Sequence, residues 1–418
     1  MKNGINTASG YRFLVVGLCF LLSLVNYMDR VIISFAIEPI QQEFGLDNAS
    51  FGVLISAFAL GTVTVNALAG WILDRSRVRI MWSASIWFWS FIMILLGMAH
   101  VLALFIALRY LLGLGEGINF PAMNRAMADW MPQAELSRMV SVGLLGVPMA
   151  MLLGGPLLSH MIDGMGWRMS FISLGILGLA VGVLWILLYR EGPFAQRPDP
   201  QAPAGADKIP WLSLLKNPTL MATSWSFFAF GYVLFFAISW MPGYLEQTYG
   251  MKLTTIGWFS SLPWALAVVL MPVAGWISDR LMKKTGNIRI ARVHVIWFCQ
   301  LLAVLFFFPL IFSQSSTVAV ICLSLAIGFS MMPNSPYYSI CTDLFQREAG
   351  AATGIMVTFF SVSGIVSPLL TGWLTDLFGG FAAAFTALNV LVTTAILGML
   401  ILAKPGQVPP DEQTSRGT

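Results

Sequence analysis

Hydrophobic residues occur along this 418-residue chain in twelve long runs, separated by short polar stretches. Most runs have about 18 or more residues, which is long enough for a helix to cross a bilayer. The runs are continuous rather than alternating, so they predict helices and not the strands of a membrane barrel. The pattern predicts an all-α membrane protein with twelve transmembrane helices. The expected spans are 12–37, 51–73, 81–99, 102–124, 139–160, 171–188, 219–244, 255–278, 293–313, 317–341, 352–374 and 382–402.

Composition excludes a soluble protein, because 57% of the residues are hydrophobic, only 10% are charged, and the mean hydropathy is +0.79. Cytoplasmic loops of membrane proteins carry an excess of Lys and Arg. If the N-terminus is cytoplasmic, 19 of the 23 Lys and Arg residues fall on the cytoplasmic side. We therefore expect both termini to be cytoplasmic in a multi-pass protein of a bacterial inner membrane. No basic patch with interleaved aromatic residues suggests a nucleic-acid partner.

The longest polar stretch, 190–215, contains five prolines and several charges, which is typical of a linker that cannot bury a core. It predicts an N-terminal six-helix bundle at 1–189, a cytoplasmic linker at 190–215 and a C-terminal six-helix bundle at 216–404. The polar tail, 405–418, is expected to be disordered and cytoplasmic.

The two halves share a motif after their second span. Gly-Trp-Ile-Leu-Asp-Arg at 70–75 recurs as Gly-Trp-Ile-Ser-Asp-Arg at 275–280, 205 residues later. A Gly lets two helices approach closely, and an Asp at a helix end can pair with an Arg across the loop. The motif predicts gates rather than binding sites, and an ordinary basic loop that only sets topology is the alternative. The expected gating residues are Gly70, Asp74, Arg75, Gly275, Asp279 and Arg280.

Four ionisable residues lie inside spans one and four. Asp29 and Arg30 are in the middle of span one, while Arg109 and Glu116 are seven residues apart and so share one helix face. Each such charge costs about 2.5–3.5 kcal/mol on insertion scales, which indicates a functional site. Depths estimated from the helical rise predict that Asp29 pairs with Arg109 and that Arg30 pairs with Glu116. A fixed structural ion pair is the alternative.

These residue types suggest a mechanism. A carboxylate beside an Arg stays ionised, and one that loses this partner in an apolar site takes up a proton. Asp29 and Glu116 are therefore the expected proton-coupling residues, and Arg30 and Arg109 form the expected anion site. The second half has no ionisable residue in mid-membrane, so its candidate substrate-binding residues are polar and uncharged. They are Tyr232, Asn334, Tyr337 and Ser361.

The chain resembles the anion:cation symporter branch of the major facilitator superfamily. The motifs that carry this resemblance are NYMDR at 26–30, the R-x6-E of span four followed by NFPAMNR, the DWMP loop, WMPGYL at 240–245 and GWxxDR. The branch includes bacterial galactonate, hexuronate, glucarate and phthalate carriers, animal sialin and the vesicular glutamate transporters. The resemblance implies that Asp29 and Glu116 are the protonation sites, that Arg30 and Arg109 bind or organise the anion, and that Tyr27 lines the site.

The sequence departs from the sugar-acid carriers of this branch at three positions. Thr62 stands where those carriers have a Tyr, Val147 where they have a Gln, and Ser361 where they have an Asn. Fewer hydrogen-bonding groups are then available for a chain of hydroxyls. We therefore expect a ligand that is shorter or more apolar than a six-carbon sugar acid and that carries a carboxylate or sulfonate.

The sequence predicts a proton-coupled symporter that imports a small organic anion by alternating access. The alternative is an exporter or exchanger of the same fold for an anionic metabolite, siderophore or drug. A membrane enzyme or receptor is disfavoured, because no nucleophile–base set or metal cluster is recognisable. We expect no cofactor apart from the proton as coupling ion, and a monomer in the lipid bilayer.

Overall fold

The structure is a computed structural model that describes residues 2–74, 76–131, 139–140, 142–194, 214–345 and 349–405, without the side chains of 2–9, 66–74 and 349–350. Of the expected linker, only 190–194 and 214–215 belong to these residues. Residues 406–418 of the expected tail lie outside them. The expected gating residue Arg75 also lies outside, as do the side chains around Gly70 and Asp74.

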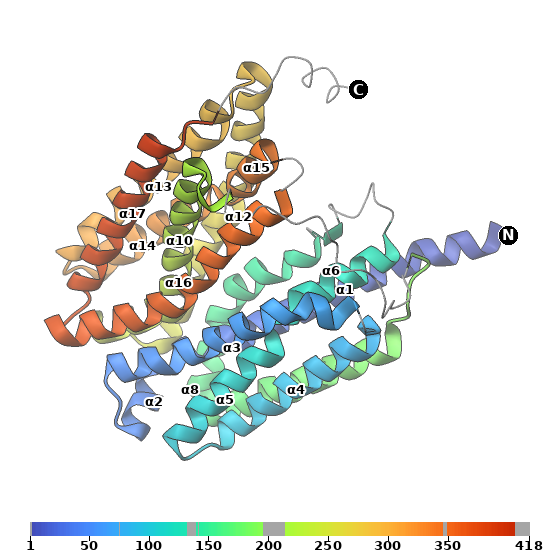
Figure 1. The fold of residues 1–418 in the computed structure, drawn as a ribbon. Coiled ribbons are helices and arrows are strands. Elements are labelled where there is room, and N and C mark those ends of the chain that lie inside the picture. Colours follow the sequence, from blue (N-terminus) through green and yellow to red (C-terminus); the bar gives the residue numbers. More distant parts are fainter. Residues whose placement is uncertain are drawn as a thin grey trace. The chain divides into compact units, whose positions relative to one another are not determined.

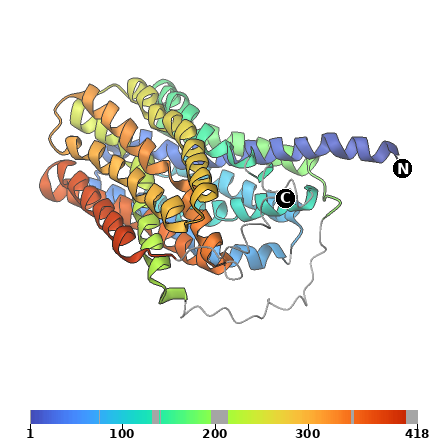
Figure 2. The ribbon, with the colours of Figure 1, turned by 90° about the horizontal axis from the view of Figure 1, so that it is seen from above.

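The chain divides into two compact units, Met1–Ala206 with Lys252–Ser261, and Asp207–Met251 with Leu262–Thr418. The helices of the first unit follow one another along the chain and are seen in Figures 1 and 2 in blue to green. They are α1 (Lys2–Phe35), α2 (Ile37–Phe44), α3 (Asn48–Asp74), α4 (Val78–Met98), α5 (Leu102–Glu116), α6 (Asn119–Trp130) and α8 (Gly146–Leu188). The first residues of α12 (Leu253–Thr285) also belong to this unit.

The second unit contains two helices that precede α12, the rest of α12 and the helices that follow it (Figure 1). A π-helical turn, η1, and a 3-10 turn, η2, flank one of its spans. Its elements are α10 (Pro218–Ser239), α11 (Met241–Tyr249), η1 (Arg289–Val293), α13 (His294–Phe307), η2 (Phe308–Ile311), α14 (Ser316–Met331), α15 (Asn334–Leu344), α16 (Ala349–Phe378) and α17 (Ala382–Leu402).

The predicted spans are confirmed. Within the described residues, eleven helical stretches are long and apolar enough to cross a membrane, and the longest is Val142–Leu188 with 47 residues. Gly166 interrupts this stretch, because its φ of 79° and ψ of 159° are not helical. A positive φ is tolerated readily only by Gly, so this residue divides the stretch into the two spans expected from the sequence. The fold has twelve spans in two bundles.

Local sequence explains several helix ends. Asn217 precedes α10, and its Oδ1 accepts the backbone N–H groups of Thr219 at 3.0 Å and Leu220 at 3.1 Å, as an N-cap should. The short helices α2 and α11 both end at a left-handed glycine, Gly45 and Gly250, which lie 205 residues apart. The internal repeat seen in the GWxxDR motif therefore extends to the loop before it.

Packing inside each unit places the polar residues discussed below. In the first unit, α8 packs against α1 and α4, and α5 packs against α3. In the second unit, α16 and α17 pack against α10, and α13 packs against α14. Figure 1 shows these helices as long rods lying side by side within each unit. Asp29 of α1 and Arg109 and Glu116 of α5 are consequently buried among neighbouring helices rather than exposed to lipid.

Candidate functional site

The centre of the first unit contains a buried ion pair between α1 and α5. Nε of Arg30 donates to Oε2 of Glu116 at 2.8 Å, with the Arg30 side chain 14% exposed and Glu116 fully buried. The pair expected from the sequence is present. Its second carboxylate oxygen, Oε1 of Glu116, has no hydrogen-bond partner among the described residues. Glu116 is therefore engaged by Arg30 through one oxygen only.

Asp29 is not paired in the way the sequence suggested. Its side chain is fully buried, and neither carboxyl oxygen has a hydrogen-bond partner within the described part of the chain. The expected pair with Arg109 is wrong. The depth estimate fixed heights along the helix axis but not directions around it. Neighbouring residues on an α-helix differ by about 100° in direction, so Arg30 can face α5 while Asp29 points elsewhere.

Arg109 is an almost fully buried cation on α5. Its side chain is 1% exposed, and Nε and Nη1 have no hydrogen-bond partner in the described residues. The centre of its guanidinium lies 4.9 Å from the centroid of the Phe58 ring of α3. Buried charges are normally paired, so this cation has unused capacity to bind an anion.

Aromatic rings surround Arg30 as well. Its guanidinium centre lies 4.9 Å from the ring of Tyr27 and 5.2 Å from the ring of Phe58. Tyr27, which the resemblance implied as a lining residue, is half-buried and contacts the edge of Phe120. Sequence reasoning missed Phe58, because a phenylalanine inside an apolar span has no distinguishing sequence signal. It also missed Asn26, which is fully buried with both amide atoms unpartnered in the described residues, although it belongs to the NYMDR motif.

The polar candidates of the second unit are largely engaged within that unit. The Tyr337 hydroxyl lies 2.6 Å from the Ser226 hydroxyl and accepts a hydrogen bond from the Gln300 amide at 3.2 Å. The hydroxyl of Tyr232 lies 3.3 Å from that of Thr371. Ser361 donates to a backbone carbonyl of its own helix, that of Val357, at 2.9 Å. Asn334 begins α15 and is half-buried. Tyr232 and Tyr337 are thus buried and hydrogen-bonded to other side chains of this unit.

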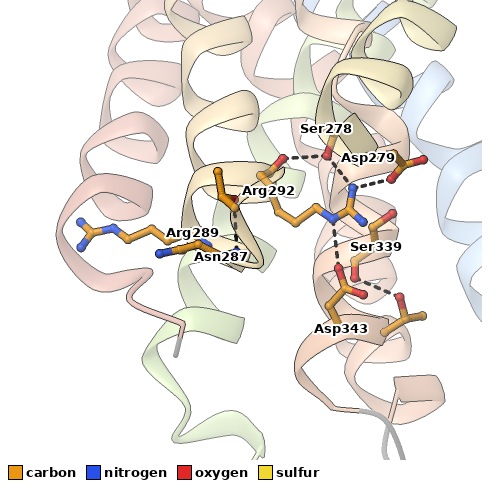
Figure 3. A network of polar contacts seen from close by, with 10 residues as sticks. Ser278, Asp279, Asn287, Arg289, Arg292, Ser339 and Asp343 are labelled. Atoms are coloured by element: carbon orange, nitrogen blue, oxygen red, sulfur yellow. Dashed lines mark hydrogen bonds and ion pairs between the residues drawn. The ribbon is translucent and has the colours of Figure 1, made fainter. Parts of the chain in front are cut away.

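The repeated motif of the second unit lies in a polar network at one end of α12 (Figure 3). Asp279 accepts from Nη1 of Arg292 at 2.8 Å, and Asp343 of α15 accepts from Nε of the same guanidinium at 3.0 Å. Ser278 accepts from Nη1 of Arg292 at 2.6 Å and donates to the Ala291 carbonyl. One arginine therefore bridges two carboxylates and joins α12, η1 and α15.

The sequence predicted Arg280 as a gating residue and did not single out Arg292. Arg280 instead lies over the ring of its neighbour Trp276, at 5.1 Å, and Gly275 approaches Ser335. Arg292 belongs to the π-helical turn η1, whose start is capped by Asn287. A π-helical turn is frequent at functional positions, but no sequence pattern signalled this one. Asp343 was missed because it falls just beyond the predicted end of its span.

The chemistry of the two clusters differs. The α1–α5 cluster has two cations and two carboxyl groups, and among the described residues only Arg30 and Glu116 of this cluster form an ion pair. Such a set of groups can bind an anion and take up protons. The Arg292 cluster has one cation shared by two carboxylates, an arrangement suited to holding α12, η1 and α15 together. Among the described residues, no group of three or more His, Cys, Asp or Glu side chains could hold a metal ion.

Comparison with known proteins defines the class. The sequence model of the Major Facilitator Superfamily matches residues 19–368 and 287–417. The chain belongs to this superfamily, so it is a multi-pass membrane transporter and not an enzyme, and the family resemblance seen in the sequence is confirmed.

Curated relatives cover almost the whole chain. A probable sulfoacetate transporter of Cupriavidus necator is 30% identical over 96% of this chain and 94% of its own. A hexuronate transporter of Bacillus subtilis is 28% identical over 94% of both chains. A probable L-galactonate transporter of Escherichia coli is 26% identical over 93% of this chain and 88% of its own.

The fold is similar to that of a solved structure. An inward-facing, unoccupied bacterial homologue of the human lysosomal transporter Spinster has a TM-score of 0.76 at 20% identity. The alignment covers 94% of this chain and 95% of that chain. The likeness supports the major facilitator fold with its two six-helix bundles.

Proposed function

We propose that this protein is a proton-coupled symporter that imports a small organic anion across a bacterial cytoplasmic membrane as a monomer, with both termini in the cytoplasm. The single observation that carries the proposal is the half-paired charge cluster of α1 and α5. Its Arg30–Glu116 ion pair is formed at 2.8 Å. Asp29 and Arg109 are buried, and among the described residues Oδ1 and Oδ2 of Asp29 and Nε and Nη1 of Arg109 have no hydrogen-bond partner.

The cluster suggests an order of events. Nε and Nη1 of Arg109 have no acceptor among the described residues, so Arg109 is the first cation available to an anionic oxygen pair. Arg30 is held by Glu116 until that carboxylate takes up a proton and loses its charge. The released Arg30 can then join Arg109 on the same anion. Binding of the anion and of the proton favour one another in this scheme, which is the requirement for symport.

The substrate class follows from the two arginines. A planar guanidinium matches a carboxylate or sulfonate in a bidentate way. The names of the relatives support an organic acid, since they refer to sulfoacetate, hexuronate, galactarate with glucarate, and galactonate. Thr62 and Ser361 stand where the sugar-acid carriers have larger polar residues. The Thr62 hydroxyl donates a hydrogen bond to the Phe58 carbonyl at 3.1 Å, and the Ser361 hydroxyl donates one to the Val357 carbonyl. Both hydroxyl protons are therefore already used within their own helices. This favours a short acid with few hydroxyls.

The remaining sequence-predicted residues have secondary roles in this proposal. Tyr27 lines the anion site from α1, and Asn334, Tyr232, Tyr337 and Ser361 contribute polar groups of the second unit. The two GWxxDR motifs act as gates, with Asp279 holding Arg292 in the second unit and Asp74 in the equivalent position of the first. No cofactor beyond the coupling proton is required.

Transport by the purified protein in proteoliposomes tests the proposal. Uptake of radiolabelled sulfoacetate, galactarate, glucuronate and L-galactonate would be measured with an inward proton gradient, with an inward sodium gradient and with neither. We expect accumulation of at least one anion with the proton gradient alone, strongest for the shortest acid. Accumulation driven only by sodium would overturn proton coupling, and uptake of none would overturn the anion assignment.

The direction of transport is tested separately. Right-side-out and inverted membrane vesicles from expressing cells would be compared under the same proton gradient. A symporter that imports the anion accumulates it in right-side-out vesicles when the outside is acidic. Accumulation in inverted vesicles with an acidic interior would instead favour an antiporter that exports the anion.

A further inference from the structure

We infer that Phe58 is a positioning residue for anion binding: its ring contacts both site arginines and stabilises Arg109, whose Nε and Nη1 have no hydrogen-bond partner among the described residues. The inference rests on the proposed function and adds to it a residue that no charge or motif indicates. Phe58 belongs to α3, whereas Arg30 and Arg109 belong to α1 and α5.

One ring contacts both cations. The guanidinium centre of Arg109 lies 4.9 Å from the centroid of the Phe58 ring, and that of Arg30 lies 5.2 Å from it. Both distances are within the range of about 6 Å in which the negative face of an aromatic ring attracts a cation. Phe58 is 9% exposed, so water screens these contacts little.

The position of the ring is fixed by a close helix crossing. A Cβ built at Gly113 of α5 would lie 2.1 Å from the Phe58 carbonyl oxygen, and one built at Gly61 of α3 would lie 2.1 Å from that of Tyr110. Only glycine permits backbones to approach so closely at these two positions. The crossing brings residue 58 against the turn of α5 that follows Arg109, and the ring has little freedom to move away.

An aromatic ring suits this place better than a carboxylate would. Two guanidiniums intended for one anion repel each other, and the repulsion is strong where water is scarce. A carboxylate between them would relieve the repulsion but would also occupy the hydrogen-bond donors needed by the substrate. The ring stabilises the positive charges through its face and accepts no conventional hydrogen bond, so Nε and Nη1 of Arg109 stay available.

The competing explanation is that Phe58 only fills the core between α3 and α5. A packing role depends on apolar volume, whereas the role inferred here depends on an aromatic face. Substitutions that separate volume from aromaticity therefore distinguish the two. Phe58→Leu and Phe58→Met keep an apolar side chain without a ring, and Phe58→Tyr keeps the ring face.

Phe105→Leu is the matched control. Phe105 is a buried ring on α5 that contacts the rings of Phe44, Trp167 and Phe171. The same substitution there removes a buried aromatic ring of the same unit from a cluster of rings. Thermal unfolding in detergent would be recorded for every variant, to separate loss of fold from loss of site geometry.

The experiment measures KM and Vmax in proteoliposomes under a fixed proton gradient, with whichever of sulfoacetate, galactarate, glucuronate or L-galactonate the wild type takes up fastest. Phe58→Leu and Phe58→Met should raise KM about tenfold, the order expected for loss of desolvated cation–π contacts. Phe58→Tyr should stay within about twofold of the wild type. Phe105→Leu should lower the unfolding temperature and leave KM unchanged.

The outcomes separate this inference from the proposed function. If the wild type takes up the anion and both ring-free variants that fold keep its KM, the inference is wrong and the proposed function stands. A Phe58→Tyr variant as impaired as Phe58→Leu, or an equal rise in KM for Phe105→Leu, would also overturn the inference. If the wild type takes up none of the four anions, the proposed function fails and the inference fails with it.

Discussion

The first unit and the second unit each contain a buried arginine beside carboxyl groups, but the two clusters treat that arginine differently. Arg292 of the second unit donates to Asp279, Asp343 and Ser278 at 2.8, 3.0 and 2.6 Å. Arg109 of the first unit has no hydrogen-bond partner at Nε or Nη1 in the described residues, and Asp29 has none at either oxygen. The hydrogen-bonding groups of the Arg292 cluster are thus paired within the protein, whereas those of the α1–α5 cluster are paired only in part.

The difference matches what each region is proposed to do. A buried polar group left without a partner costs about 1–3 kcal/mol, so a chain keeps such groups where another requirement outweighs stability. Transport is such a requirement, because polar atoms that the protein leaves without a partner are open to a substrate or a proton. A gate needs the opposite property, since its contacts must form a stable closed state without any ligand. The comparison can be tested by changing one cluster at a time.

The largest expected effect is on accumulation. Glu116→Gln and Asp29→Asn should each abolish proton-driven accumulation, because neither side chain can then carry the coupling proton, while at least one variant retains substrate counterflow. Glu191→Gln is the matched control, since Glu191 and Arg77 form an exposed pair at 3.8 Å. Uptake and counterflow in proteoliposomes measure both properties. Concentration of substrate by both buried variants would contradict the coupling assignment.

Removing the cation should have opposite effects on stability in the two clusters. Arg292→Met removes the ion pair between Arg292 and the Asp343 side chain, which is 7% exposed, and should cost about 3–5 kcal/mol of unfolding free energy. Arg109→Met removes a buried cation whose Nε and Nη1 have no partner within the described part of the chain, and it should be neutral or slightly stabilising. Reversible unfolding in mixed micelles measures both. Equal losses for the two variants would show that the clusters do not differ as described.

Substrate binding should depend on the shape of Arg109 and not only on its charge. Arg109→Lys keeps the positive charge but loses the planar fork, so binding should weaken by about 1.5–3 kcal/mol, or roughly 10- to 150-fold. Arg79→Lys provides a control, because Arg79 donates to the Ile186 carbonyl and lies outside the cluster. Calorimetry or thermal shift with the transported anion measures affinity. Unchanged affinity in Arg109→Lys would remove this residue from the anion site.

The smallest expected effect separates the two acids of the Arg292 network. Asp279 is 64% exposed and Asp343 is 7% exposed, although both bond the same guanidinium. Asp279→Asn should therefore lower stability by less than about 1 kcal/mol and only at low salt. Asp343→Asn should lower it by more, at any salt concentration. Unfolding at low and high salt measures the contrast, and a larger loss for Asp279→Asn would reverse the assignment of the structural acid.

Much of the fold could be predicted because its signals are local or one-dimensional. Apolar run length specifies where a helix crosses the bilayer, and the 205-residue recurrence of GWxxDR reveals two related halves. Depth along a span can be counted at about 1.5 Å per residue, which was enough to predict that Arg30 meets Glu116. The charges themselves were conspicuous, since Asp, Glu and Arg are expensive in the membrane interior.

Tertiary structure decided which way each side chain points and what it meets. Depth counting does not give direction around a helix, so it wrongly paired Asp29 with Arg109. Phe58 has the same sequence signal as any other phenylalanine of a span, and only the crossing of α3 and α5 brings its ring into contact with two arginines. Arg292 has no distinguishing sequence signal, and only the structure shows that it lies in a π-helical turn and contacts two carboxylates. The sequence by itself determined the spans and the buried charges, because hydrophobicity and charge belong to single residues. Partners belong to pairs of residues far apart in the chain, and only the packing of the helices determines them.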